Sequence, residues 1–270
     1  MAVFLSEVAF LQMGKGKDLV FLHGYLSSKE AFTAQINYFS RFFRVTAIDF
    51  VGFGGSMPLK EPFSVADYAH WTQEVLRLLN VQKPHVIAHS FGCRVAVKMA
   101  SISPDCFDKM LLTGAAGVVL KRGFRYHLRV KTYRLVRRIA PKFAEKRFGS
   151  AEYRTLPPIM RESYKKIVNE DLRTDARKIE NEVLFVQGKS DTTTPKKEVD
   201  AYLVCVKRGK CVMMDGGHFA FAEHPLTFNI IAEEFFYGGN NNEDHSMPFN
   251  NAVAVPFHGE NDGGAATKRL

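Results

Sequence analysis

The chain of 270 residues has few cysteines and no long apolar run. Its four cysteines form no Cys-x-x-Cys pair and no Cys/His spacing suited to zinc, which favours reduced, mostly buried thiols in a cytoplasmic protein. No window approaches the about 18 consecutive apolar residues that a transmembrane helix needs, so none is expected. Residues 1–7 lack a basic stretch and Glu7 interrupts their apolar run, which predicts a strand and not a signal peptide.

The glycine-containing loops lack the spacing of nucleotide-binding motifs. Residues 52–58 have no third glycine at dinucleotide-fingerprint spacing, and no helix is expected to begin there. Residues 14–17, Gly-Lys-Gly-Lys, lack the spacing of a Walker loop and fit a hairpin turn. The sequence therefore predicts neither a cofactor nor a metal.

Short, mostly apolar runs alternate with helical segments along the chain. The runs lie at 19–22, 44–48, 86–89, 109–113, 183–186 and 211–214. Helices are expected at 29–41, from Ser64 or Asp67 to Leu79, from the end of the run 86–89 to about Met99, and at 196–206 and 224–236. This alternation is typical of a mostly parallel sheet covered by helices on both faces. Residues 2–13 are expected to add one or two edge strands.

The net charge of +9 is concentrated in one segment. Residues 121–147 contain eleven lysines and arginines and one glutamate, so the rest of the chain is close to neutral. Interleaved aromatic and aliphatic residues at helical spacing predict an amphipathic helix there. This basic segment belongs to an insertion, residues 118–180, that interrupts the strand–helix alternation. Residues 238–270 are rich in Asn, Gly and acidic residues and are expected to form a mobile tail.

Two roles are open for the basic segment. It can be a lid helix whose apolar stripe faces a substrate cavity while its charges stay in water. Alternatively, its charges can attract an anionic substrate, an acidic carrier protein or an anionic membrane surface. Nucleic-acid binding is not expected, because no recognition module or stacking motif accompanies the charge.

The most informative stretch is the expected strand-to-helix junction that contains Ser90. The pattern Ala88-x-Ser90-x-Gly92 differs from the Gly-x-Ser-x-Gly of a nucleophile elbow only at its first residue. Small residues on both sides permit the strained backbone that lifts a serine hydroxyl out of the sheet. The helix that follows places its positive end beneath that hydroxyl. Ser90 is therefore a candidate nucleophile.

Two more reactive side chains follow later strands of the same expected sheet. Asp191 follows the run 183–186, and His218 follows the run 211–214. Open α/β sheets bind ligands outside the carboxyl ends of their strands, so both side chains are expected near Ser90. A serine nucleophile needs an imidazole to take its proton and a carboxylate to fix the tautomer of that imidazole. The chain order Ser, Asp, His is the one found with a nucleophile elbow.

A set of motifs over roughly residues 15–237 resembles the α/β-hydrolase fold family. They are Leu22-His23-Gly24-Tyr25, Asp49-x-x-Gly52-x-Gly54-x-Ser56, His89-Ser90-Phe91-Gly92, Gly188-x-x-Asp191-x-x-x-Pro195 and Gly217-His218. The resemblance implies an α/β fold in which residues 1–117 and 181–237 form the core and 118–180 form a helical lid.

The resemblance also implies a role for individual residues. The nucleophile, base and orienting acid would be Ser90, His218 and Asp191. The backbone N–H groups that hold the oxyanion would be those of Tyr25 and Phe91. Supporting positions would be His23, which braces the oxyanion loop, Gly24 and Gly92. The second histidine, His224, is expected to support the following helix and not to act as the base.

These residues favour a cytoplasmic, cofactor-independent serine hydrolase that cleaves small or medium carboxylic esters through an acyl-enzyme. A serine nucleophile excludes the alkyl-ester intermediates of relatives that use a carboxylate. Two alternatives are open. The same residues could cleave a carbon–carbon bond, a thioester or an amide. The pocket could also serve a non-catalytic ligand receptor or signalling protein, with the basic segment as its docking surface.

Overall fold

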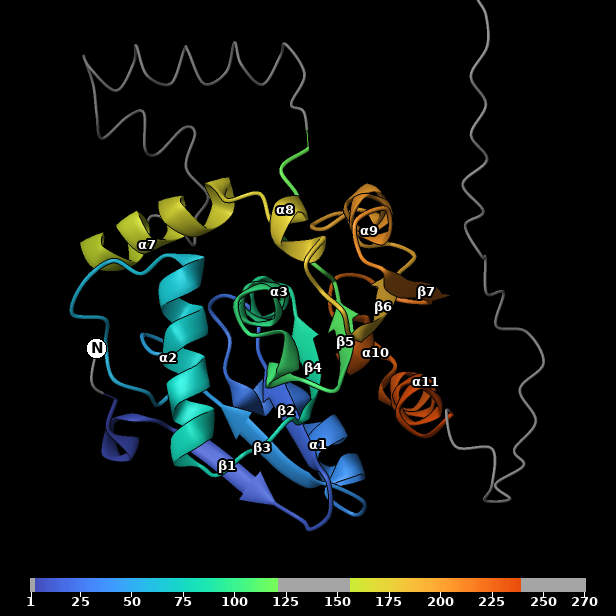
Figure 1. The fold of residues 1–270 in the computed structure, drawn as a ribbon, viewed down its shortest axis with the longest axis horizontal. Coiled ribbons are helices and arrows are strands. Elements are labelled where there is room, and N and C mark those ends of the chain that lie inside the picture. The colour runs from blue at the N-terminus through green and yellow to red at the C-terminus, as the bar shows by residue number, and fades with distance from the viewer. Residues whose placement is uncertain (1–2, 121–155, 239–270) are drawn as a thin grey trace, which may run out of the picture.

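The computed structural model describes residues 3–120 and 156–238 (Figure 1). The basic segment and the tail from residue 239 onward lie outside the described residues, so the roles expected for them stay predictions. In the part of the chain that is described, no helix has the length and apolar character needed to cross a membrane.

Seven strands form one sheet in the order β1-β3-β2-β4-β5-β6-β7. The strands are β1 Phe10–Met13, β2 Asp18–Leu22, β3 Arg44–Ile48, β4 His85–His89, β5 Lys109–Thr113, β6 Glu182–Gly188 and β7 Arg208–Met214. Within the described ranges, the edge strand β1 pairs antiparallel with β3 and the other strand pairings are parallel. The predicted fold class, a mostly parallel sheet flanked by helices, is confirmed.

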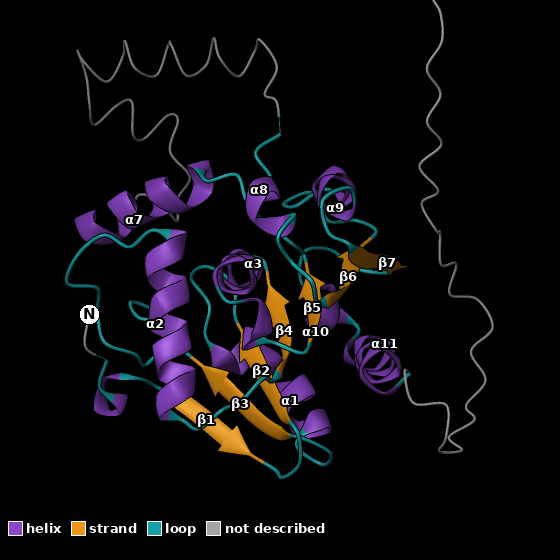
Figure 2. Ribbon diagram, in the orientation of Figure 1, coloured by secondary structure: helices purple, strands orange, loops and turns teal. Residues whose placement is uncertain are grey.

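Helices connect the strands and cover both faces of the sheet (Figure 2). The α-helices are α1 Thr33–Phe39, α2 Val65–Leu78, α3 Phe91–Ile102, α7 Pro158–Asn169, α8 Arg173–Ala176, α9 Lys196–Leu203, α10 Ala220–Glu223 and α11 Pro225–Tyr237. The 3-10 turns are η1 Leu5–Glu7, η2 Lys29–Phe32 and η3 Pro104–Cys106. Of the two candidate caps for α2, Ser64 is the N-cap, and Asp67 completes a reciprocal capping box with it.

The strand expected at residues 1–7 is absent from the described part of that segment. Residues 5–7 form η1 instead, and only β1 follows as an edge strand. The backbone just before β1 is hydrogen-bonded to a glycine-rich loop and not to a strand: Met57 N donates to Glu7 O (3.0 Å), and Ala9 N donates to Ser56 Oγ (2.9 Å). Local apolar composition cannot reveal this competing partner, because it lies about fifty residues away.

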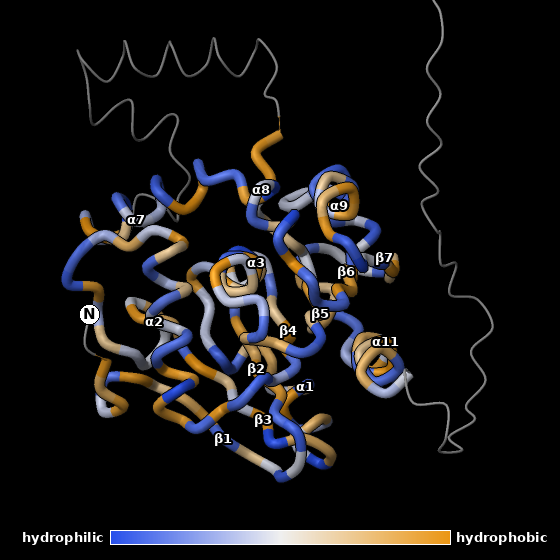
Figure 3. Tube along the Cα trace, in the orientation of Figure 1, coloured by the Kyte–Doolittle hydropathy of each residue, from blue (hydrophilic) through white to orange (hydrophobic). Residues whose placement is uncertain are grey.

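Alternate side chains of each central strand enter two separate cores. In β2, Val20 and Leu22 pack in the core beneath α2, α3, α7 and α9, whereas Leu19 and Phe21 pack in the core beneath α1, α10 and α11. Apolar and polar residues alternate along the flanking helices in Figure 3, as expected for helices with one face on a sheet. Both faces of the sheet are thus covered, and the strand ends remain as the place for a site.

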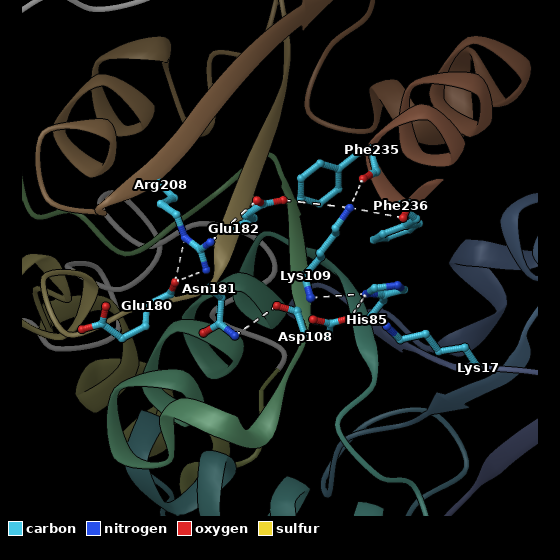
Figure 4. Close-up of polar contacts among 10 residues, drawn as sticks. All are labelled: Lys17, His85, Asp108, Lys109, Glu180, Asn181, Glu182, Arg208, Phe235 and Phe236. Carbon is cyan, nitrogen blue, oxygen red and sulfur yellow. Dashed lines mark hydrogen bonds and ion pairs between the residues drawn. The ribbon is translucent and has the colours of Figure 1, made fainter. Parts of the chain in front are cut away.

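The amino ends of β4 and β5 are tied to the end of α11 by a polar network (Figure 4). Lys109 Nζ donates to the carbonyl oxygens of Phe235 (2.9 Å) and Phe236 (3.2 Å). Lys109 N donates to His85 Nδ1 (3.3 Å), and the His85 ring stacks on Phe236 with centroids 4.7 Å apart. Burial lowers the pKa of His85 to about 4, so this histidine is neutral when the network is formed.

Candidate active site

Ser90 occupies a strained junction between β4 and α3. Its φ of 50° and ψ of −106° lie in a region that side chains other than glycine rarely adopt. Its backbone N donates to Thr113 O at the end of β5 (3.1 Å), which helps to hold this conformation. The hydroxyl therefore stands at the carboxyl end of the central strands, and the first turn of α3 begins at the next residue.

Two glycines leave room for this junction. A Cβ added at Gly92 would lie 2.2 Å from Leu22 O, too close for any side chain. A Cβ added at Gly24 would lie 2.8 Å from His89 Nδ1 and 3.6 Å from Ser90 Cβ. The loop after β2 and the start of α3 can approach each other only because both positions lack a side chain.

Asp191 and His218 meet although 27 positions separate them in the sequence. His218 Nδ1 lies 2.9 Å from Asp191 Oδ2, and the Asp191 side chain is fully buried. Both residues follow neighbouring strands, β6 and β7, whose pairing runs to Gly188 opposite Met214. The loops that leave the two strands therefore start at the same level of the sheet edge.

The ring of His218 also lies close to the ends of β4 and β5, and its centroid is 4.7 Å from that of His89, the last residue of β4. A Cβ added at Gly114, directly after β5, would lie 3.1 Å from the His218 ring. The preceding residue, Thr113, accepts the hydrogen bond from Ser90 N. The strands β4 and β5 are adjacent, and their pairing extends to His89 opposite Thr113. Ser90, His218 and Asp191 therefore share one edge of the sheet.

Asp191 is held as a carboxylate. Burial by itself would raise its pKa, but hydrogen bonds from His218, from the backbone N–H of Thr194 and from the Thr194 hydroxyl outweigh burial and bring the pKa well below its usual range. Thr193 N and Thr194 N donate to Oδ1 at 2.8 and 3.0 Å, and Thr194 Oγ1 donates to Oδ2 at 2.8 Å. An ionised carboxylate can only accept, so the proton on His218 Nδ1 points to Asp191 and Nε2 is left as a base.

The other two histidines at this edge are neutral and hydrogen-bonded to backbone. His23 Nδ1 donates to Gly24 O (2.7 Å) and its Nε2 accepts from Phe50 N (3.0 Å). His89 Nε2 donates to the backbone oxygen of His218 (2.9 Å). Burial lowers the pKa of His23 to about 4 and that of His89 to about 3. Both rings therefore position loops of the site.

These neutral histidines predict that the fold loses stability in mild acid. The unfolded chain takes up protons near pH 6.5, whereas folded His23, His85 and His89 resist protonation until about pH 4 or below. The contribution of these neutral histidines to the free energy of unfolding is therefore fully present above pH 6.5. It is lost as the pH drops toward 4, by about 3 kcal/mol for each such histidine. Urea unfolding at pH 7, 6, 5 and 4.5 measures the slope, which His85→Gln should reduce by about 1.4 kcal/mol per pH unit. A free energy of unfolding that is constant between pH 7 and 5 would contradict this.

Tyr25 joins the loop after β2 to α7. Its ring contacts Phe91 edge-on (centroids 5.7 Å apart) and Tyr164 at 5.1 Å, and its hydroxyl donates to Met160 O (3.3 Å). Phe91, which directly follows Ser90, is buried. The two residues whose N–H groups are predicted to hold the oxyanion are thus in ring contact.

Two residues of this region were not identified from the sequence as site residues. Thr194 bonds the Asp191 carboxylate and lies 3.2 Å from His218 Nδ1; its only signal in the sequence is a place among three threonines that also fit a turn. Arg94, buried in α3, donates from Nη1 to Ile167 O and Glu170 O (both 2.9 Å) and so fastens the end of α7 to the helix behind Ser90. In the described ranges, no group of His, Cys, Asp and Glu side chains could hold a metal ion.

A family model described as the alpha/beta hydrolase fold matches residues 18–156. The chain belongs to the α/β-hydrolase fold family. The matched part of this α/β-hydrolase includes Ser90 and the loop with Tyr25, whereas Asp191 and His218 lie beyond it. The membership expected from the motifs is confirmed, and the protein is a member of a hydrolase family.

Relatives of this α/β-hydrolase include enzymes and proteins of unassigned activity. An Acinetobacter baylyi (E)-2-((N-methylformamido)methylene)succinate hydrolase is 30% identical over 37% of the chain, a match that spans only 38% of that relative's own length. The AB hydrolase superfamily protein YisY of Bacillus subtilis is 26% identical over 83% of the chain and 92% of its own.

Solved structures share the fold of this α/β-hydrolase. A meta-cleavage product hydrolase from Pseudomonas fluorescens superposes with a TM-score of 0.67 at 21% identity, over 86% of this chain and 95% of that one. A thermophilic esterase from Thermogutta terrifontis superposes with a TM-score of 0.68 at 20% identity, over 86% of this chain and 93% of that one. At these identities the likeness is one of fold.

Proposed function

We propose that this α/β-hydrolase is a serine esterase that cleaves carboxylic esters through an acyl-enzyme on Ser90. The observation that carries the proposal is the 2.9 Å contact between His218 Nδ1 and the buried carboxylate of Asp191, at the sheet edge where Ser90 stands strained. A strained serine, an imidazole held in one orientation and an ionised carboxylate on one edge are the parts that acyl transfer needs.

The reaction begins with proton transfer from Ser90 to His218 Nε2. Ser90 Oγ attacks the ester carbonyl carbon, and the carbonyl π electrons move to its oxygen to form a tetrahedral oxyanion. The N–H groups of Tyr25 and Phe91 donate to that oxyanion, and the positive end of α3 adds to their field. Asp191 keeps the imidazole oriented and stabilises its charged form.

Collapse of this intermediate releases the alcohol and leaves the acyl group on Ser90. His218 gives its proton to the leaving oxygen, so the alcohol departs neutral. Water then attacks the acyl-enzyme with His218 again as the base, and the free acid is released. Neither half of the reaction requires a cofactor.

The insertion 118–180 would form the lid of this site. Of its described part, α7 supports that arrangement, because Met160 O accepts from the Tyr25 hydroxyl and the Tyr164 ring contacts the Tyr25 ring. Motion of α7 would therefore displace the loop after β2, which carries the proposed oxyanion donor Tyr25 N–H.

Labelling with a fluorophosphonate probe tests the nucleophile. We expect wild type to gain the mass of one phosphonyl adduct, because the probe mimics the tetrahedral intermediate, and Ser90→Ala to gain none. Ser40→Ala, at the end of α1 and away from the site, is the matched control and should label like wild type. An adduct that persists in Ser90→Ala would place the nucleophile elsewhere, and an unlabelled wild type would favour the receptor alternative.

A substrate panel separates the ester from the other bonds that the same residues could cleave. It should contain matched esters, thioesters and amides with one acyl group, and a β-diketone for carbon–carbon cleavage. The amide belongs in the panel because the Acinetobacter relative is named for a formamido-substituted succinate. The proposal expects the highest kcat/KM for the esters; a higher value for the amide or the diketone would overturn the choice of bond.

A further inference from the structure

Leu26 has a backbone conformation that its side chain does not favour. Its φ is 56°, in the left-handed region, within a turn closed by the hydrogen bond from Ser27 N to Gly24 O (3.3 Å). Turns with a positive φ at this position normally carry glycine or asparagine there. A γ-branched leucine is an unfavourable choice on backbone grounds alone.

Packing does not explain the leucine either. Leu26 is 48% exposed, and it is not among the described residues that form or pack against the two cores. A single exposed leucine is ordinary on a protein surface, but an exposed leucine in a strained conformation gains little that offsets the strain. The turn itself is held from both sides, by His23 on Gly24 O and by the Tyr25 ring on α7.

A second exposed apolar side chain lies at the opposite segment of the site. Phe219 directly follows His218 and is 47% exposed. Its ring centroid lies 5.4 Å from that of His218 and 4.9 Å from that of His89. The His89 ring also touches the Leu26 turn, since a Cβ at Gly24 would lie 2.8 Å from His89 Nδ1. The two segments that carry the exposed side chains therefore meet at His89.

We infer that Leu26 and Phe219 are specificity-determining residues that contact the leaving group of the substrate and select an apolar alcohol. The inference rests on the proposed esterase function. His218 must protonate the leaving oxygen, so the alcohol part lies on the side of His218, next to Phe219. The Tyr25 ring is directed toward α7, which leaves the neighbouring Leu26 as the apolar group that the turn presents to solvent.

Two series of esters test the inference. One holds the acyl group constant and lengthens the alcohol from methyl to butyl; the other holds a methyl alcohol and lengthens the acyl group. For wild type, kcat/KM should rise about tenfold along the alcohol series, because each methylene is partly withdrawn from water. In Leu26→Asn and Phe219→Ser the rise should shrink to about twofold, while the acyl series keeps its wild-type slope.

Two further readouts distinguish a leaving-group contact from a structural role. The alcohol has departed before deacylation, so hydrolysis of the preformed acyl-enzyme should show the same rate constant in wild type and both variants. Leu26→Asn should also keep or raise Tm, since asparagine tolerates a positive φ. Leu226→Asn, which removes an exposed leucine (67%) from α11, is the matched control and should keep the wild-type slope.

The outcomes separate this inference from the proposed function. A flat alcohol series for wild type, an equal loss at every alcohol length, or a loss that follows acyl length would overturn the inference and leave the esterase intact. If wild type turns over no ester faster than Ser90→Ala does, the proposed function fails and the inference with it.

Discussion

Ser90→Ala should lower kcat for a cleavable ester by about 10⁵-fold, and His218→Ala should lower it to a similar extent. Each substitution removes the acyl-enzyme route completely, since neither the nucleophile nor its base works alone. For the same reason the double variant should be no slower than either single variant. Steady-state hydrolysis of a p-nitrophenyl ester, followed over hours with concentrated enzyme, measures all three rates.

The backbone of Ser90 offers a control that separates lost chemistry from lost structure. At φ 50° an alanine keeps the strain, whereas a glycine removes it. Ser90→Gly should therefore be inactive and yet more stable than Ser90→Ala by about 1 kcal/mol in urea unfolding. A loss of only tenfold in kcat for Ser90→Ala would contradict the assignment of Ser90 as the nucleophile. A kcat unchanged in His218→Ala would contradict the assignment of His218 as its base.

Asp191→Asn should lower kcat by about 10⁴-fold with little change in the fold. The two backbone donors to Oδ1, Thr193 N and Thr194 N, can still be satisfied by the amide oxygen. The amide nitrogen then takes the place of Oδ2 and donates to His218 Nδ1, which forces the proton to Nε2. Nε2 of His218 then carries a proton and cannot accept the one from Ser90. The pH–rate profile should therefore change in shape as well as fall in rate at every pH.

Thr194→Val is a milder variant to compare with Asp191→Asn. It removes the hydroxyl that donates to Asp191 Oδ2 (2.8 Å) but leaves the carboxylate and its backbone donors in place. We expect a fall in kcat of about tenfold and a rise in the pKa of Asp191, because one of the hydrogen bonds that lowers it is gone. A loss in Asp191→Asn no larger than that in Thr194→Val would show that the carboxylate does not orient the base.

Local patterns in the sequence were sufficient to predict the main elements of the fold. The apolar runs predict six of the seven strands described in the sheet. For β2 to β6 the reason is burial, because a strand buried on both faces must be apolar throughout, whereas the edge strand β7 is largely unburied and was predicted from its short apolar run alone. The small residues around Ser90 predict the strained junction, and at Gly92 the structure shows why, because a Cβ there would collide with Leu22 O. The segment before β1 was predicted wrongly, since its hydrogen-bond partner Ser56 is remote in sequence.

The order of reactive residues along the chain also suggested which side chains share an edge of the sheet. Ser90, Asp191 and His218 each follow a strand, and parallel strands end at the same edge. That reasoning needs only topology, which the strand–helix alternation supplies. It carries no information on which atoms touch, so neither the Thr194 hydroxyl on Asp191 nor the Arg94 link to α7 could be inferred.

The sequence by itself therefore determined the layers of this protein, its family and the residue types available for chemistry, because these depend on periodicity and on short motifs. Only the tertiary structure decided how His89 binds the backbone of His218, how Thr194 holds Asp191, and that Leu26 stands exposed with a positive φ. Such contacts join residues far apart in the chain through strand register and loop geometry. A short stretch of sequence encodes neither, because each depends on where the other strands of the sheet end.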